Sequence, residues 1–114
     1  MSTTPKELAR TYFDAWQQGD WERLRGILAD DATFAGPMGT AADADACVAG
    51  LQGMAEMISR LEIRAMVADE TDVITWYDLV VGDTTVPTAN WSHVEDGTIT
   101  RIRAAFDPRP ILGP

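Results

Sequence analysis

Hydrophobic residues in the first half of the chain recur at three- and four-residue intervals, as they do along one face of an α-helix. This spacing predicts helices over residues 5–18, 21–28 and 44–59. A run of β-forming residues at 31–35 predicts a short strand between the second and third helices. Residues that typically begin or end helices support these bounds: Thr4, Pro5, Gly19, Asp20, and Asp43 or Thr40.

The second half of the chain changes to the alternating pattern of β-strands and is rich in β-branched residues. It predicts four strands joined by hairpin turns, of which Asp96-Gly97 is the strongest signal. Because helices come first and an antiparallel meander follows, the order is that of one α+β domain over residues 1–114. The predicted strands are 61–67, 73–81, 85–94 and 98–106, with turns at 69–72, 82–83 and 95–97.

The composition adds a strongly acidic character. The chain has 18 acidic and 9 basic residues, a net charge of −9, and no cluster of Lys or Arg. Nucleic acids and anionic membranes are bound through such clusters, so we expect neither as a partner. The N-terminus lacks the apolar run of a signal peptide, and no stretch is long enough to span a membrane. We therefore expect a soluble, cytoplasmic protein.

The sequence offers little for metal or nucleophilic chemistry. Cys47 and His93 are the one cysteine and the one histidine, and they lie far apart in the sequence. This spacing does not match a metal site, and we expect no metal or other cofactor. Cys47 lies between Ala46 and Val48 on an apolar helix, which favours a core role over a nucleophilic one.

Three segments carry a family resemblance: YFDAWQQGD at 12–20, LADDATF at 28–34 and EDGTITRIRAAFDP at 95–108. They resemble the nuclear transport factor 2-like superfamily, and its SnoaL-like branch in particular. The resemblance implies a cone-shaped α+β fold, with three N-terminal helices packed on the concave face of a curved, mostly antiparallel sheet. It also implies an apolar pocket inside the cone and a homodimer through the outer face of the sheet. Polyketide cyclases, ketosteroid isomerase and limonene epoxide hydrolase are similar, so the fold does not settle the reaction.

The same resemblance suggests catalytic residues. The epoxide-hydrolase pattern implies a pocket carboxylate at Asp78, and the isomerase pattern implies a tyrosine at Tyr12 and a second donor at Asn90. Asp78 is then predicted to act as acid/base, with Tyr12 or Asn90 donating to a developing enolate oxygen. The chain departs from both patterns, because Gly36 replaces the isomerase base and Ala104 replaces the second hydrolase aspartate. Neither named activity is therefore assigned.

Side chains alternate across a strand, so one anchor assigns a whole face. With Asp78 as anchor, the even-numbered residues of 74–80 are predicted to face the first helix and the odd-numbered residues to face outward. The predicted ligand-binding residues are Trp16, Phe34, Met38, Met54, Trp76, Ile102 and Phe106. The residues predicted to face a dimer partner are Tyr77, Leu79, Trp91 and His93.

Two functions stay open at this point. The first is a cofactor-independent cyclase, isomerase or hydrolase that acts on a hydrophobic small molecule. The second is a non-catalytic ligand-binding or dimeric assembly module with a vestigial pocket. Structural roles also remain open, since Asp78 and Asn90 can satisfy buried polar groups and Tyr12 can fill the core. Hydrogen-bond reach between Asp78 and either Tyr12 or Asn90, around an open cavity, would favour the enzyme.

Overall fold

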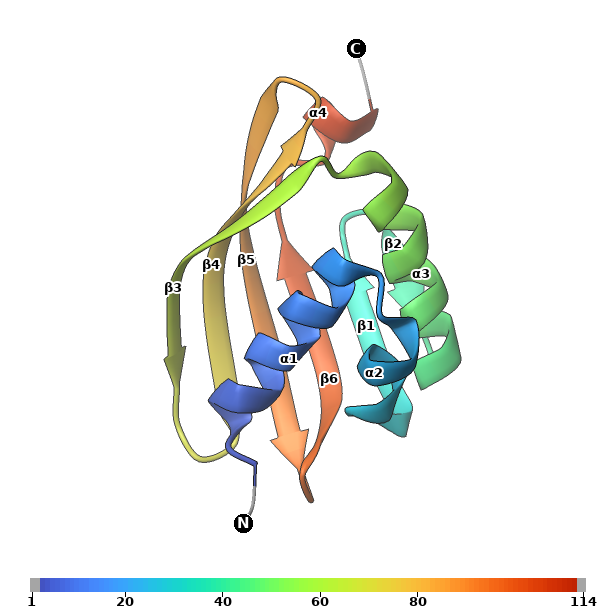
Figure 1. Cartoon of the computed structure of the whole chain (residues 1–114), viewed down its shortest axis with the longest axis vertical. Helices are drawn as coiled ribbons and strands as arrows, with labels where there is room; N and C mark the ends of the chain where they lie inside the picture. The colour runs from blue at the N-terminus through green and yellow to red at the C-terminus, as the bar shows by residue number, and fades with distance from the viewer. Residues whose placement is uncertain (1–2, 113–114) are drawn as a thin grey trace.

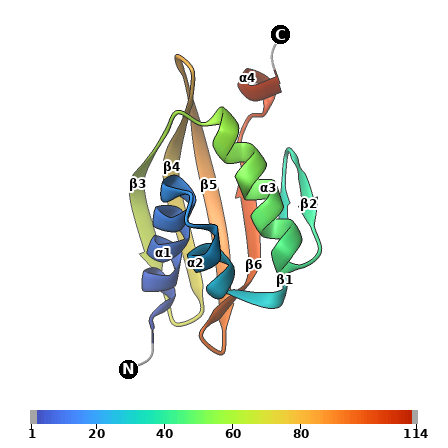
Figure 2. The ribbon, with the colours of Figure 1, turned by 45° about the vertical axis from the view of Figure 1, so that its right-hand side comes forward.

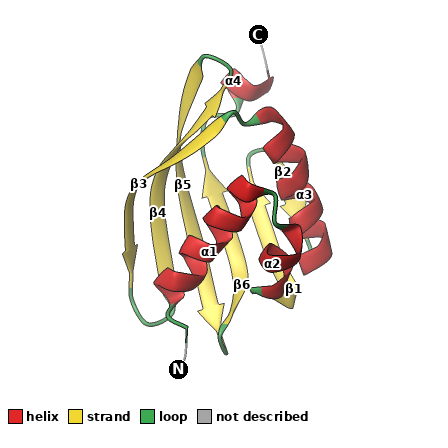
Figure 3. Cartoon of the chain, in the orientation of Figure 1, coloured by secondary structure: helices red, strands yellow, loops and turns green. Residues whose placement is uncertain are grey.

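The computed structural model describes residues 3–112 and confirms the predicted α+β order (Figure 1). Helices cover one face of a single sheet, as the colouring by secondary structure makes plain (Figure 3). The helices are α1 (Pro5–Gln18), α2 (Trp21–Gly26), α3 (Ala44–Met57) and α4 (Arg109–Leu112). The strands are β1 (Leu28–Gly36), β2 (Gly39–Ala41), β3 (Arg60–Ala68), β4 (Asp72–Val81), β5 (Thr84–Glu95) and β6 (Thr98–Ala105).

The helix starts follow from local capping chemistry. Thr4 Oγ1 accepts a hydrogen bond from the backbone N–H of Glu7 at 3.2 Å, and Asp20 and Asp43 accept equivalent bonds at the starts of α2 and α3. Gly19 ends α1 with a φ of 70°, a left-handed conformation that glycine adopts without strain. These caps confirm the predicted starts, with Asp43 and not Thr40 capping the third helix.

The six strands run in the order β2-β1-β6-β5-β4-β3. All neighbours are antiparallel except β1 and β6, which are parallel. Turning the molecule shows α1, α2 and α3 on the same face of the curved sheet (Figure 2). The sequence pattern missed β2 and α4, which have three and four residues and carry no periodic signal of their own.

The register between β4 and β5 corrects the predicted faces of β4. The two strands are joined by a two-residue turn, so Val81 lies opposite Thr84 and Thr75 lies opposite Asn90. Odd-numbered residues of β4 therefore share a face with even-numbered residues of β5. The buried residues of β4 are Val73, Thr75, Tyr77 and Leu79.

Tyr77 provides direct evidence for this correction. Its ring centroid lies 4.9 Å from that of Phe13 on α1, so Tyr77 faces the helix and not the outside. The prediction that even-numbered residues of 74–80 face inward is wrong. It went wrong because the family pattern was used to anchor Asp78 inside the pocket. The apolar residues on both faces of β4 did not contradict that anchor, since Ile74 and Trp76 are apolar although they are 46% and 48% exposed on the outer side.

Aromatic residues of α1 form the centre of the core. Tyr12 and Phe13 pack edge to face with ring centroids 4.9 Å apart, and both side chains are buried. Trp16 Nε1 donates to the backbone carbonyl of Leu51 at 2.8 Å, which ties α1 to α3. Within residues 3–112, no helix has the length and apolar content needed to cross a membrane.

Candidate ligand-binding site

A cluster of uncharged polar side chains lies inside the cone. Asn90 and Ser92 come from β5, Tyr77 comes from β4 and Tyr12 comes from α1, and all four are at most 2% exposed. Ser92 Oγ donates to Asn90 Oδ1 at 3.2 Å. Asn90 Nδ2 is buried and has no hydrogen-bond partner, the one such side-chain atom in the described part of the chain. Buried amide groups are normally satisfied, so this free donor marks the site.

The two tyrosine hydroxyls of this cluster remain protonated at neutral pH. Burial raises the pKa of Tyr12 well above its ordinary value, and the nearby Tyr77 and Cys47 add to the rise. Burial likewise raises the pKa of Tyr77. The Asn90 side chain faces both hydroxyls and partly lowers both pKa values, although its Nδ2 completes a hydrogen bond to neither. Both phenols are therefore available as hydrogen-bond donors.

A pocket of about 160 Å³ opens between α3 and the β1–β2 hairpin. Phe34, Met38 and Met54 line it together, where the sequence predicted ligand contacts. Cys47 and Leu51 also line it, although they were not predicted as ligand contacts. Their helical spacing from Met54 could have indicated that they share its face of α3. The wall is largely apolar: Phe34, Met38, Gly39, Thr40, Ala41, Ala46, Cys47, Gly50, Leu51 and Met54.

Cys47 connects the pocket wall to the polar cluster. Its thiol donates to the backbone carbonyl of Ala32 at 3.5 Å and is close enough to Tyr12 to raise the pKa of the phenol. Burial raises the pKa of the Cys47 thiol itself, so the thiol stays neutral and unreactive. Cys47 is therefore a pocket-lining residue that also lies near Tyr12 of the polar cluster.

Three other predicted ligand contacts lie elsewhere. Trp16 lines a second pocket, of about 170 Å³, with Ile58 and Leu61. Ile102 is buried beside Phe34, its partner in the parallel β1–β6 pair. Phe106 follows β6 and packs against the core without lining either of these pockets.

Asp78 and Trp76 lie on the outer face of the sheet, which contradicts their predicted place in the pocket. Asp78 Oδ2 accepts a hydrogen bond from Arg64 Nε at 2.8 Å, and Arg64 also pairs with Glu62. Trp76 is 48% exposed on the same face. The sheet separates Asp78 from Tyr12, so the convergence expected of an acid/base site is absent.

The predicted dimer face needs the same correction. Tyr77 and Leu79 are buried in the core, Tyr77 against Phe13 of α1, and cannot meet a partner. Trp91 and His93 do lie on the outer face, as predicted, because their neighbours Asn90 and Ser92 point inward. The exposed apolar residues that the structure adds to this face are Val67, Ile74 and Trp76.

The interior lacks charge. Every Asp and Glu within residues 3–112 is exposed or half-buried, and none is buried. Nor do the same residues contain a group of three or more His, Cys, Asp or Glu arranged to hold a metal ion. The site as described offers hydrogen-bond donors and apolar surface but no general base.

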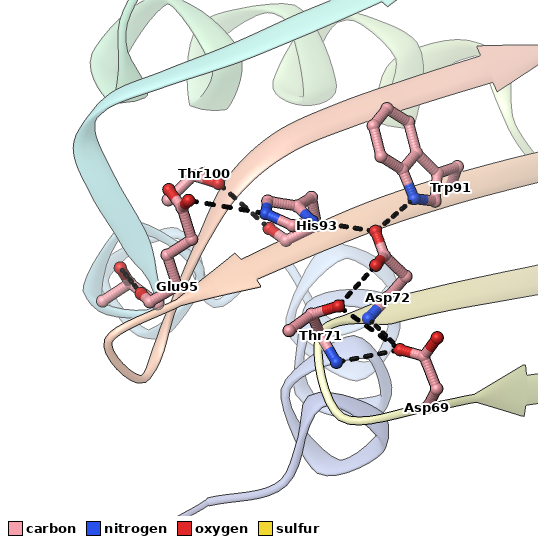
Figure 4. A network of polar contacts seen from close by, with 8 residues as sticks. Asp69, Thr71, Asp72, Trp91, His93, Glu95 and Thr100 are labelled. Carbon is pink, nitrogen blue, oxygen red and sulfur yellow. Dashed lines mark hydrogen bonds and ion pairs between the residues drawn. The ribbon is translucent and has the colours of Figure 1, made fainter.

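Figure 4 shows a second polar network, on the outer face where β4 begins and β5 ends. Asp72 accepts hydrogen bonds from Thr71 Oγ1 at 2.6 Å and Trp91 Nε1 at 2.7 Å, and contacts His93 Nδ1 at 2.8 Å. His93 Nε2 lies 3.6 Å from a Glu95 oxygen. These bonds, first that from Thr71, lower the pKa of Asp72 to about 2. The network ties the β3–β4 turn to β5.

This network predicts a pH-dependent stability. The hydrogen bond to Asp72 raises the pKa of His93 from its ordinary value. Stabilisation by protonated His93 is therefore complete below the unfolded pKa of about 6.5 and is lost as pH rises through the folded pKa. We expect His93→Asn to lower the melting temperature more at about pH 6 than at about pH 9, as thermal unfolding would measure. An equal loss at both pH values would contradict this.

Comparisons with known proteins identify the family and the fold. The profile of the SnoaL-like domain family matches residues 9–102, and the chain belongs to this family. A Kribbella flavida protein is 26% identical, with a TM-score of 0.86 over 93% of this chain and 88% of that one. An NTF2-like protein of unknown function from Cytophaga hutchinsonii is 24% identical, with a TM-score of 0.82 over 99% and 98%. An LEH-like epoxide hydrolase from M. tuberculosis is 23% identical, with a TM-score of 0.72 over 88% and 80%. No curated protein sequence matches the chain.

Proposed function

We propose that this domain binds an uncharged apolar small molecule that presents a hydrogen-bond acceptor, such as a carbonyl oxygen, to Asn90. The observation that carries the proposal is the unpartnered Nδ2 of Asn90 inside the cone. An unsatisfied buried donor costs about 1–3 kcal/mol, and a ligand acceptor would recover that free energy. Membership of a family related to isomerases, cyclases and hydrolases agrees with a small-molecule pocket.

The lack of buried charge in the described part of the chain restricts the kind of ligand that the site can bind. Tyr12 and Tyr77 are neutral donors beside Asn90, and no cation of the described chain is buried with them. An anionic group would lose its hydration there without gaining an ion pair, so the site favours a neutral acceptor. The pocket of about 160 Å³ is smaller than the roughly 300–1,000 Å³ typical of drug-sized ligands, which favours a compact molecule.

Binding is favoured over catalysis because a base is missing. Proton abstraction next to a carbonyl needs a general base within hydrogen-bond reach of the substrate. Asp78, the predicted acid/base, lies on the outer face with Arg64. At Gly36, the side-chain position that the isomerase pattern fills with a carboxylate is approached by the Phe34 ring, 3.2 Å from an ideal Cβ. The alternative of a non-catalytic ligand-binding module is therefore the function that we propose.

A matched pair of ligands tests the proposal. 4-Fluoroacetophenone and 1-ethyl-4-fluorobenzene have similar shapes, but only the first has a carbonyl oxygen. We expect the ketone to bind about tenfold more tightly, because one recovered hydrogen bond is worth about 1–1.5 kcal/mol. ¹⁹F NMR titrations of both compounds measure the difference. Asn90→Leu should remove the preference, and a wild-type protein without any preference would refute the proposal.

We also propose that two copies associate through the outer face of the sheet. Val67, Ile74 and Trp76 expose apolar surface there, as interfaces do. Asp72 on β4 and Arg101 on β6 both lie opposite His93 of β5, so a two-fold axis parallel to β5 would bring Asp72 of each copy toward Arg101 of the other.

This association predicts the effect of one substitution. Trp76→Glu places a charge in the middle of the proposed interface and should convert a dimer to a monomer in sedimentation experiments. Gln52→Glu, on the exposed side of α3, adds the same charge away from the interface and should leave the dimer intact. A monomeric wild-type protein at the concentrations used would rule out the association.

A further inference from the structure

Asn90 does not line the pocket that opens beside α3, although its free Nδ2 is the donor that a ligand would satisfy. The described pocket ends at an apolar wall that includes Phe34. Because Asn90 is 2% exposed and does not line the pocket, a ligand that enters there reaches its side chain only if a pocket-lining side chain moves. The identity of that side chain follows from the register of β1, β6 and β5.

Phe34 links the wall of the pocket to the strand position beside Asn90. Its ring extends over Gly36: a Cβ built on Gly36 would lie 3.2 Å from Phe34 Cε1 and 3.6 Å from the Cβ of Ala104. Ala104 in turn is the cross-strand partner of Asn90. The ring thus contacts the pocket on one side and approaches the strand position next to Asn90 on the other.

The small residues Gly36 and Ala104 leave space for the Phe34 ring beside them. Gly36 has no side chain, and Ala104 has only a methyl group, so the ring occupies the space that larger residues at these positions would fill. Phe34 is also only half-buried, so part of its ring already faces the pocket and solvent. An aromatic ring in such a place can change rotamer with a modest loss of buried surface.

We infer that the ring of Phe34 is the gate between the pocket and Asn90 and that it sets the size of ligand that reaches the donor. The inference rests on the proposed function, because it presumes a carbonyl ligand at Asn90. When a ligand binds only to the open arrangement, its apparent affinity falls by the fraction of molecules that are open. A compact ketone needs little displacement of the ring, whereas a two-ring ketone needs the full opening.

Two variants at this position test the gate, with ¹⁹F NMR titration of 4-fluorobenzophenone as the readout. We expect Phe34→Ala to bind this two-ring ketone about tenfold or more tightly than wild type, since the variant is always open. Phe34→Leu keeps more of the packing, and its affinity should lie between the two. Met57→Ala removes a methionine that is 40% exposed on α3 and does not line the pocket, and should change the affinity by less than about twofold.

The outcomes separate the gate from the function on which it rests. Equal affinities of wild type, Phe34→Leu and Phe34→Ala for 4-fluorobenzophenone would overturn the gate, while a wild-type preference for 4-fluoroacetophenone over its ethyl analogue would leave the proposed function standing. An equal gain in Met57→Ala would also overturn it, because the gain would then not depend on the residue at position 34. If wild type bound 4-fluoroacetophenone no more tightly than its ethyl analogue, both the proposed function and the gate would be refuted.

Discussion

Replacing Tyr77 by alanine is expected to lower the free energy of unfolding by about 3–5 kcal/mol, whereas the same replacement of its neighbour Asp78 costs at most about 1 kcal/mol. The contrast follows from the two faces of β4. Tyr77 is 2% exposed, and its ring packs on Phe13 at a centroid distance of 4.9 Å. Its removal leaves a cavity between α1 and the sheet that the surrounding residues fill only in part.

Asp78 makes a different kind of contact. It pairs with Arg64, whose side chain is 54% exposed, and such partly solvated ion pairs contribute little to stability. Urea denaturation of both alanine variants, compared with wild type at neutral pH, measures the two losses. A larger loss for Asp78→Ala than for Tyr77→Ala would mean that β4 turns its other face to the core.

Asn90→Asp is expected to make stability steeply dependent on pH. The substitution keeps the shape of the side chain but places a carboxyl group at a site that is 2% exposed and has no buried cation nearby. Desolvation raises the pKa of a buried carboxyl group by up to about 3–5. The variant would therefore fold with the introduced carboxyl group protonated, although an unfolded aspartate ionises near pH 4.

The sign of the effect follows from linkage. Below about pH 4 both states are neutral, and the variant should match wild type. Above about pH 4 the introduced carboxyl group ionises only in the unfolded state. The free energy of unfolding of the variant therefore falls by about 1.4 kcal/mol per pH unit, which amounts to about 4 kcal/mol at pH 7. Gln52→Glu, an added charge on the exposed side of α3, should show no such slope. A pH-independent Asn90→Asp variant would indicate a hydrated or cation-bearing interior.

Local chemistry explains why the helix starts were predictable. Thr4, Asp20 and Asp43 each accept a hydrogen bond from the backbone N–H three residues later in the chain. Both partners of the contact are therefore close in the sequence, and a local pattern can predict it. β2 and α4 were missed because elements of three or four residues have no periodicity. Their positions depend on what they pack against, which a local pattern does not contain.

The faces of β4 were predicted wrongly although the sequence held the answer. Ile74 and Trp76 alternate with Val73 and Tyr77, so hydrophobicity fits either face. The deciding signal was the two-residue turn at 82–83, which fixes the register of the hairpin. That register pairs residue 75 with residue 90, so an inward Asn90 requires an inward Tyr77.

The candidate site was predictable in part. Tyr12 and Asn90 were placed inside the cone from the family pattern, and both are buried there. Tyr77 was missed because of the wrong face. Ser92 lies two residues after Asn90 on β5, so strand alternation puts it on the same inward face. The free Nδ2 of Asn90 was not predictable, because it depends on which acceptors the folded chain brings close to the amide.

The proposed function depends on Asn90 Nδ2 donating a hydrogen bond to the bound ligand. The most direct measurement is the ¹H and ¹⁵N chemical shifts of the Asn90 side-chain amide, assigned with Asn90→Leu, as each matched ligand is added. We predict that 4-fluoroacetophenone shifts these signals strongly and that 1-ethyl-4-fluorobenzene leaves them nearly unchanged. Saturation of the protein with the ketone without a change at the Asn90 amide would contradict the account.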